Sequence, residues 1–222
     1  MAWVPTAYKS DILDFFSVAG APGVYNKATG SGFGAQWVQP GKKGKGGFVA
    51  GVNYVAQNGN DSTKGQFDED GSLNTLAQVG YRAPQYGIAF GYRYGTEGTR
   101  VRNFNALGGG SGNLAANQTS NGYAFNAYWQ PKKSGIIPSV SGAYGWNTVS
   151  LSNNVQTPRG ATDSQTWFVG TQWSDVFIKG NAAGFAIGAP GNASSLAADQ
   201  KALMWEAFYR YKVSDAISVT PA

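Results

Sequence analysis

The sequence predicts an all-β, antiparallel fold. Three observations lead to this expectation: strands with one large apolar face, connections that alternate in length, and a composition rich in glycine and poor in charge. Between Tyr86 and Gly95 every second residue is large and apolar, and the residues between them are small or charged. Because successive side chains of a strand point to opposite faces, this segment has one apolar face and one small, polar face.

The same alternation recurs at 123–129, 140–146, 167–173 and 203–211. Five charged residues inside the best-defined strands all fall on the parity opposite the large apolar side chains: Arg82, Arg93, Glu206, Arg210 and Lys212. Repeated strands of this kind fit either a soluble β-sandwich with a shared core or a barrel whose apolar side meets lipid.

Read as strands, the alternation predicts ten elements in chain order. They are 33–39, 48–56, 73–82, 86–95, 122–130, 138–147, 165–173, 176–187, 203–212 and 216–221. The connections between them are short and long in turn, and outer-membrane barrels gather short turns at one rim and long loops at the other. A sandwich has no reason to sort its loops this way. The sequence therefore predicts an antiparallel up-and-down transmembrane β-barrel.

Residues 1–30 lack the alternation of the later segments. We therefore expect a short helix and a connecting loop there, followed by a barrel segment over 31–222. Ser10 can cap a helix over 11–17, and the glycine- and proline-rich stretch 19–23 ends it. Such a helix is either part of a loop folded into a pore or a surface connection. The last strand would end at the rim opposite to the one where even-numbered barrels finish. We therefore expect about ten strands of a larger, 16-stranded barrel, truncated at both ends.

The composition excludes several classes of function. The chain has no cysteine and no histidine, so thiol catalysis, zinc sites and Ser-His-Asp chemistry are absent in their usual forms. We expect no enzymatic activity, no metal site and no cofactor. The net charge is +5, but the basic residues are scattered over turns and strand faces, so we expect no nucleic-acid partner.

Several segments in order resemble the cyanobacterial outer-membrane porins of the carbohydrate-selective porin (OprB-like) family. These segments are 10–16, 19–26, 122–131, 172–177, 205–211 and 217–221. The resemblance implies an outer-membrane diffusion channel that passes ions and small hydrophilic solutes by passive transport. It further implies a homo-oligomer, a trimer, anchored to the cell wall through an N-terminal S-layer-homology domain. That domain, the early strands and the closing strand have no counterpart in these residues.

In a barrel the polar parity would line the lumen. The predicted pore-lining residues are Asn53, Asn74, Gln78, Arg82, Arg93, Asn126, Gln172, Glu206, Arg210 and Lys212. Arg100 and Arg102 begin the longest loop, as a constriction or as a solvated loop base. The predicted lipid-facing residues are Tyr86, Ile88, Phe90, Tyr92, Tyr94, Trp129, Trp146, Trp167, Trp173, Trp205 and Tyr209.

Three points stay open at this stage. Gly87, Ala89 and Gly91 leave space beside Arg93, either for an inward loop or, at the glycines, to relieve strand curvature. Strand 176–187 is ambiguous because Lys179 shares parity with Phe177, which a bulge near residue 180 would resolve. The alternative functions are a soluble, lectin-like carbohydrate-binding sandwich and a surface receptor or adhesin that acts through its long loops.

Overall fold

The computed structural model describes most of the chain, with gaps. The described residues are 3–10, 12–13, 16, 23–25, 29–40, 45–68, 71–102, 111–114, 116–133, 135–150, 163–193 and 201–221. Among them no helix is long and apolar enough to span a bilayer.

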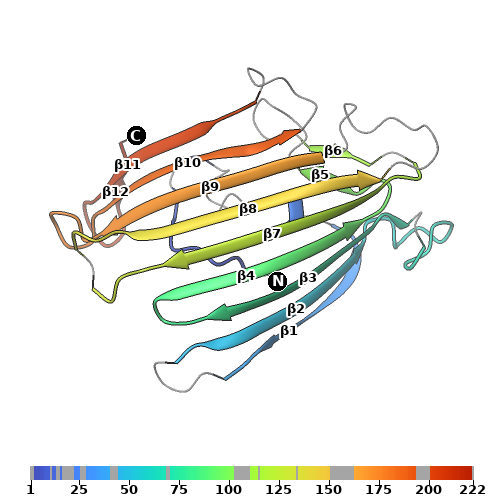
Figure 1. Ribbon diagram of the computed structural model, residues 1–222, viewed down its shortest axis with the longest axis horizontal. Helices are drawn as coiled ribbons and strands as arrows, with labels where there is room; N and C mark the ends of the chain where they lie inside the picture. Colours follow the sequence, from blue (N-terminus) through green and yellow to red (C-terminus); the bar gives the residue numbers. More distant parts are fainter. Residues whose placement is uncertain are drawn as a thin grey trace.

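Ten strands form one antiparallel sheet in which each strand pairs with the next along the chain (Figure 1). Their bounds are β1 Ser31–Val38, β2 Gly47–Ala56, β3 Leu73–Arg82, β4 Tyr86–Gly95, β7 Thr119–Trp129, β8 Ser139–Ser150, β9 Asp163–Ser174, β10 Ala182–Ala193, β11 Met204–Lys212 and β12 Ser218–Val219. The all-β fold and the antiparallel neighbour order predicted from the alternation are confirmed. The sheet is open, with β1 and β12 as its two edges.

The connections at one rim of the sheet are shorter than those at the other. The rim on the left of Figure 1 carries 39–46, 83–85, 130–138, 175–181 and 213–217, and each of these is shorter than its neighbours along the chain. The opposite rim carries 57–72, 96–118, 151–162 and 194–203. A short hairpin of β5 (Arg100–Arg102) and β6 (Ser111–Asn113) lies within the longest connection and was not expected from the sequence.

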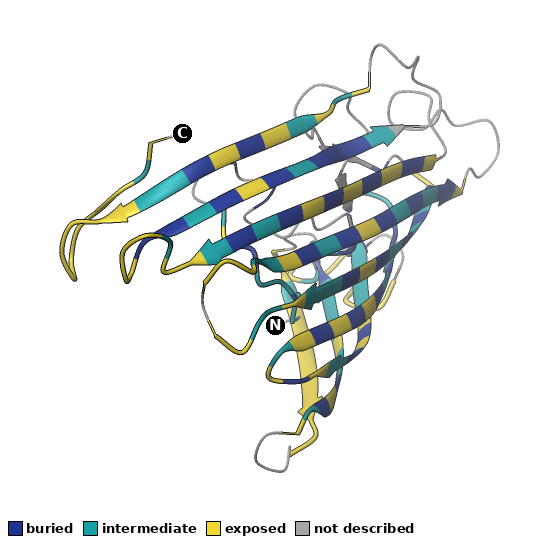
Figure 2. Cartoon of the chain, turned by 60° about the vertical axis from the view of Figure 1, so that its left-hand side comes forward, coloured by how far each residue is buried: buried dark blue, intermediate teal, exposed yellow. Residues whose placement is uncertain are grey.

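The two faces of the sheet differ in burial. Along β9 the residues from Asp163 to Gln172 alternate between exposed or half-exposed and buried, a pattern that repeats across the curved sheet (Figure 2). We call the face that bears Phe90 and Trp205 the outer face and the opposite one the inner face. Ile88, Phe90 and Trp205 are 40%, 41% and 65% exposed. A sandwich would cover them with a second sheet, and within the described residues the only other sheet is the β5–β6 hairpin.

The strand predicted over 176–187 was wrong at its start, because β10 begins at Ala182. Asp175 and Phe177 have φ values of 60° and 58° and Gly180 has 95°, a left-handed backbone that belongs to a turn rather than to a strand. Lys179 therefore lies in a turn, and its parity has no meaning. The register shift in β10 falls between Ala189 and Asn192 instead of near residue 180.

The helix predicted over 11–17 falls mostly on residues outside the described part of the chain. Of its seven positions, Ile12, Leu13 and Phe16 are described, and the Phe16 N–H donates to the Leu13 carbonyl at 3.0 Å. Of the described residues in this region, Phe16 has helical conformation, and Gly23–Tyr25 form a 3-10 turn, η1.

Candidate functional site

The strand register places all ten predicted pore-lining residues on the inner face. Arg82, for example, lies opposite Gly87, in a row that crosses the sheet through Ser141 to Glu206. Gln78, Arg93, Asn126, Gln172 and Glu206 are buried; Asn53, Asn74 and Arg210 are half-buried; Arg82 and Lys212 are exposed. Whether this face lines a pore stays a prediction, but its shared orientation is a property of the structure.

Three buried members of this set, Gln78, Gln172 and Glu206, accept hydrogen bonds from the described residues of 3–25, which we call the N-terminal segment. It begins on β3, where the Trp3 N–H donates to Gln78 Oε1 at 3.0 Å. The Gln78 amino group in turn donates to the Trp3 carbonyl and to Tyr25 Oη. One side-chain amide thus holds both ends of the segment.

The middle of the N-terminal segment is held by β8 and β9. The N–H groups of Ala7 and Tyr8 donate to Ser141 Oγ at 2.8 and 3.1 Å. The Lys9 N–H donates to Gln172 Oε1 at 2.7 Å. Each of these backbone N–H groups of the N-terminal segment therefore has the hydrogen-bond acceptor that a buried amide requires.

Glu206 on β11 makes the densest contact with the N-terminal segment. Its Oε1 accepts from Tyr8 Oη at 2.5 Å, and its Oε2 accepts from Ser10 Oγ at 2.8 Å and from the Leu13 N–H at 2.9 Å. Hydrogen bonds to an ionised carboxylate are shorter and stronger than neutral ones. A carboxylate predicted to face a lumen is therefore used to hold a distant segment of the same chain.

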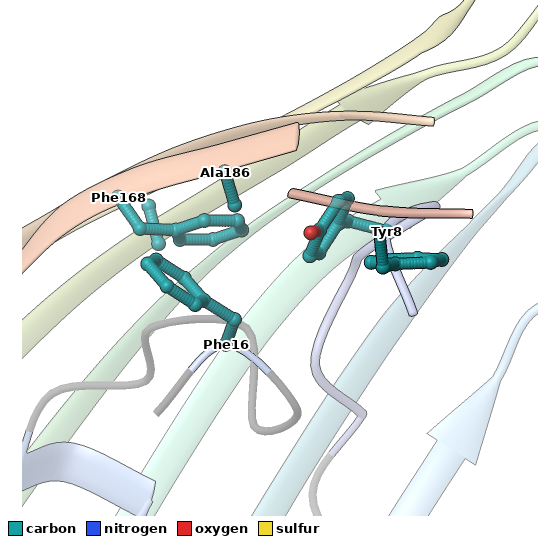
Figure 3. Close-up of a cluster of buried hydrophobic side chains, with 6 residues drawn as sticks. Tyr8, Phe16, Phe168 and Ala186 are labelled. Carbon is teal, nitrogen blue, oxygen red and sulfur yellow. The ribbon is translucent and has the colours of Figure 1, made fainter. Parts of the chain in front are cut away.

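An aromatic cluster supports these polar contacts (Figure 3). Tyr8 and Phe16 of the N-terminal segment pack against Phe168 of β9 and Phe208 of β11, together with Ala143 and Ala186. The ring centroids of Phe16 and Phe168 lie 6.3 Å apart, and those of Tyr8 and Phe208 6.2 Å apart. Each of these aromatic side chains is at most 5% exposed, so the inner face carries a dry patch within a polar surface.

Glycines on the inner face make room for this segment. A Cβ at Gly87 would lie 3.1 Å from the Trp3 ring, one at Gly91 3.0 Å from Val24, and one at Gly170 2.8 Å from the Tyr8 ring. The space foreseen beside Arg93 is thus filled by an inward-lying part of the chain, which answers the question that the sequence left open.

Arg93 holds the base of the longest connection. Its Nε donates to Asn74 Oδ1 at 2.7 Å, and its two terminal nitrogens donate to Ser120 Oγ at 3.2 Å and to Thr99 Oγ1 at 3.3 Å. Thr99 immediately precedes β5, where Arg100 and Arg102 lie, but the side chains of those two arginines are outside the described part. Their constriction role stays a prediction.

Two further buried groups characterise the interior. Burial raises the pKa of the Tyr25 phenol to about 12, against a smaller lowering by its hydrogen bond with Gln78. Tyr25 therefore remains a neutral hydroxyl at ordinary pH. The side-chain amide of Asn126 is buried and has no hydrogen bond within the described part of the chain, which costs about 1–3 kcal/mol.

The outer face carries all eleven residues predicted to meet lipid, as the register shows. Six of them are exposed: Tyr86, Ile88, Phe90, Trp129, Trp167 and Trp205. Tyr92, Tyr94, Trp146, Trp173 and Tyr209 are half-buried by their neighbours on the same face. Tyr123 stacks on Trp146 with ring centroids 4.9 Å apart and also contacts Tyr92. These rings form a continuous aromatic row toward the rim with long loops.

Comparison with known proteins adds one relative. The chain is 30% identical over 206 residues to the uncharacterized protein sll0772 of Synechocystis sp. (strain ATCC 27184 / PCC 6803 / Kazusa), an alignment that covers 77% of this chain and 35% of that protein. No family model and no solved structure matches the chain. The chain therefore spans about a third of the length of this relative.

Sequence reasoning named Gln78, Gln172 and Glu206 but missed three other inner-face residues that contact the N-terminal segment, namely Ser141, Phe168 and Phe208. Phe168 and Phe208 are large apolar residues on the polar parity of their strands, and this exception was the available signal. Ser141 gave no such signal, because a serine is an ordinary residue on a polar strand face. Trp3 and Tyr8 lie in a segment without periodicity, so nothing local indicated which strand they contact.

Proposed function

We propose that this chain forms part of the wall of an outer-membrane porin, a channel that passes ions and small hydrophilic solutes by passive diffusion. The proposed architecture is an up-and-down transmembrane β-barrel of 16 strands, to which these ten strands contribute. The main support for this proposal is that the aromatic outer face of the sheet is exposed, while its polar inner face contacts the N-terminal segment of the same chain.

The bare outer face supports a lipid environment. Soluble proteins rarely expose contiguous apolar patches larger than a few hundred Å², and here the exposed rings and aliphatic side chains extend from β1 to β12. One row across the six strands from β4 to β11 consists of Ile88, Ala127, Gly142, Val169, Ile187 and Trp205. A row without a polar side chain suits acyl chains and disfavours water.

The open edges support a larger barrel. Unpaired N–H and C=O groups cost several kcal/mol each in hydrocarbon, so a sheet in a membrane closes on itself. Further strands would then lie between β12 and β1. The length of the Synechocystis relative agrees with a protein that holds more strands than this chain does.

The N-terminal segment would narrow the lumen of such a barrel. It covers β3, β8, β9 and β11 on the inner face, so solutes would pass between this segment and the remaining wall. Arg82 and Arg210 are not fully covered, and they would give the passage a basic lining that favours anions. The charge of Lys212 is paired with Asp215, with Nζ and Oδ1 2.6 Å apart.

The partners proposed with this function follow from the resemblance to the carbohydrate-selective porin (OprB-like) family. They are outer-membrane lipids, small polar solutes or inorganic ions, a trimer of the same chain, and the cell wall through an S-layer-homology domain. A cyanobacterial outer membrane would be the location, and the long loops would face outward.

The test is planar-bilayer conductance of the full-length protein, with reversal potentials in a salt gradient. We expect ohmic, non-gated conductance steps and a reversal potential displaced toward anion selectivity. A folded, inserted protein without conductance steps would refute the channel function. A protein that stays folded and monodisperse without detergent would favour the lectin-like alternative.

A further inference from the structure

A pocket of about 350 Å³ lies on the inner face at the rim with short connections. Its lining comes from the ends of β1, β2, β3 and β7 and from the β1–β2 and β3–β4 connections. Ligand pockets commonly enclose about 300–1,000 Å³, so this space suits a small molecule. It is separate from the aromatic cluster, whose sheet residues lie on β8 to β11.

Two cations of the lining come from different elements. Arg82 ends β3, and Lys45 lies in the β1–β2 connection. Arg82 Cζ lies over the Trp3 ring, 5.9 Å from the ring centroid. Within the described part of the chain, no acceptor takes a hydrogen bond from the side chain of Arg82 or of Lys45. Because a guanidinium carries five N–H donors and an ammonium three, both groups have donors to offer to a ligand.

No carboxylate compensates these two cations in the lining. The ranges 29–60, 71–96 and 98–162 contain neither aspartate nor glutamate, and every described residue of the lining lies within them. In the strand register Arg82 stands between Gly47 of β2 and Gly87 of β4, so neither neighbouring strand places a side chain beside it in this row. The pocket therefore has a positive charge that favours an anion.

Apolar side chains form much of the remaining wall. Tyr128 of β7 lies in the same row as Arg82, and its ring covers Gly87, where an added Cβ would lie 2.5 Å from Tyr128 Cε1. The aliphatic part of the wall consists of Val38, Val49, Ala83 and Pro84. Such a wall favours an alkyl group, whereas an ion that is hydrated on every side loses water there without gaining a hydrogen bond.

We propose that this pocket binds a small organic carboxylate, with its carboxylate on Arg82 and Lys45 and its alkyl group against the apolar wall. A guanidinium presents paired N–H donors that match the two oxygens of a carboxylate, and the lysine ammonium adds a second charge. The role of the site rests on the proposed function, because in a channel the inner face would be the conducting surface and the pocket would meet passing solutes.

The experiment measures binding to the folded, detergent-solubilised full-length protein by ligand-observed NMR. The probes are acetate, butyrate, butyramide and inorganic phosphate. Burial of two further methylenes should make butyrate bind about 15-fold more tightly than acetate. Butyramide has the same length without the charge and should bind at least tenfold more weakly than butyrate, and phosphate should also bind more weakly than butyrate.

A pair of double variants tests the two cations. Lys45→Gln/Arg82→Gln should weaken butyrate binding at least tenfold. The matched control is Lys64→Gln/Lys201→Gln, which removes the same charge from connections at the opposite rim and should bind butyrate as the unmodified protein does.

The outcomes separate this site from the channel function. Butyrate binding that exceeds acetate binding and is weakened in Lys45→Gln/Arg82→Gln alone supports the site. Absent butyrate binding, equal binding of butyrate and any other probe, or an equal effect of the two double variants overturns it. Because binding is measured without current, a protein that binds butyrate but shows no conductance refutes the channel and keeps the site. A protein that conducts but does not bind butyrate refutes the site and keeps the channel.

Discussion

Replacement of Glu206 by glutamine should release the N-terminal segment from the inner face. The carboxylate accepts from Tyr8, Ser10 and the Leu13 N–H. A hydrogen bond to a charged group contributes about 1.5–3 kcal/mol. The glutamine oxygen can still accept from Ser10 and the Leu13 N–H, while its amino group donates to the Tyr8 hydroxyl, so the contacts lose their charge rather than their number. Because charge-assisted hydrogen bonds are about twice as strong as neutral ones, we expect a loss of about 2 kcal/mol over the three contacts, or roughly a 30-fold rise in the open population.

Trypsin cleavage after Lys9 measures this opening in the folded, detergent-solubilised protein. When opening and closing are fast relative to cleavage, the cleavage rate follows the open population, so Glu206→Gln should be cut about 30 times faster. Glu97→Gln is the matched control, because within the described part of the chain Glu97 accepts one hydrogen bond, from the Asn117 N–H, in a solvated loop at the other rim. Cleavage of Glu206→Gln within twofold of the unmodified rate, or equal acceleration in both variants, would refute the reasoning.

Three further outcomes follow from the same contacts. Gly170→Ala should displace the Tyr8 ring, which lies 2.8 Å from the new Cβ, and so raise tryptic cleavage of the N-terminal segment. In the control variant Gly142→Ala the nearest atom to the new Cβ is 3.4 Å away, so cleavage should not change. Phe90→Lys should lower the yield of membrane-inserted protein in a heat-modifiability gel, since a cation at the bilayer midplane costs about 2–4 kcal/mol, while Val219→Lys near the rim should cost about 0–1 kcal/mol. Because the pKa of Tyr25 is raised in the folded protein, its contribution to stability is complete below pH 10 and is lost as the pH rises to about 12. The difference in urea midpoint between the unmodified protein and Tyr25→Phe should therefore stay constant below pH 10 and shrink between pH 10 and about 12.

The strands could be predicted from the sequence because their signal is local. Each strand repeats an apolar face with a period of two, and the predicted bounds of 73–82 and 86–95 agree with β3 and β4. The same signal failed over 176–181, where Phe177 and Ile178 continue the apolar composition in a turn. Composition alone does not report a positive φ, and the glycine at 180 was interpreted as a bulge.

The N-terminal segment could not be placed from the sequence, because its contacts join residues far apart in the chain. Glu206 and Tyr8 are 198 positions apart, and the segment has no periodicity that would assign it to a face. The charge of Glu206 was correctly placed on the inner face, but its partners were not foreseen. A polar residue on the inner face is expected to be exposed to solvent, whereas Glu206 forms hydrogen bonds with residues far away in the sequence.

The central claim is that the outer face meets lipid and the inner face does not. The chain has no cysteine, so single cysteines can carry a nitroxide without removing native thiols. In the reconstituted full-length protein, one set of labels lies on the outer face of β9, at Trp167, Val169 and Thr171, and a second set lies on its inner face, at Thr166, Gly170 and Gln172. We expect the outer-face labels to collide often with oxygen and rarely with a water-soluble nickel chelate. The inner-face labels should not show this combination. Equal access of the nickel chelate to both sets, or protection of both sets from oxygen, would contradict the account.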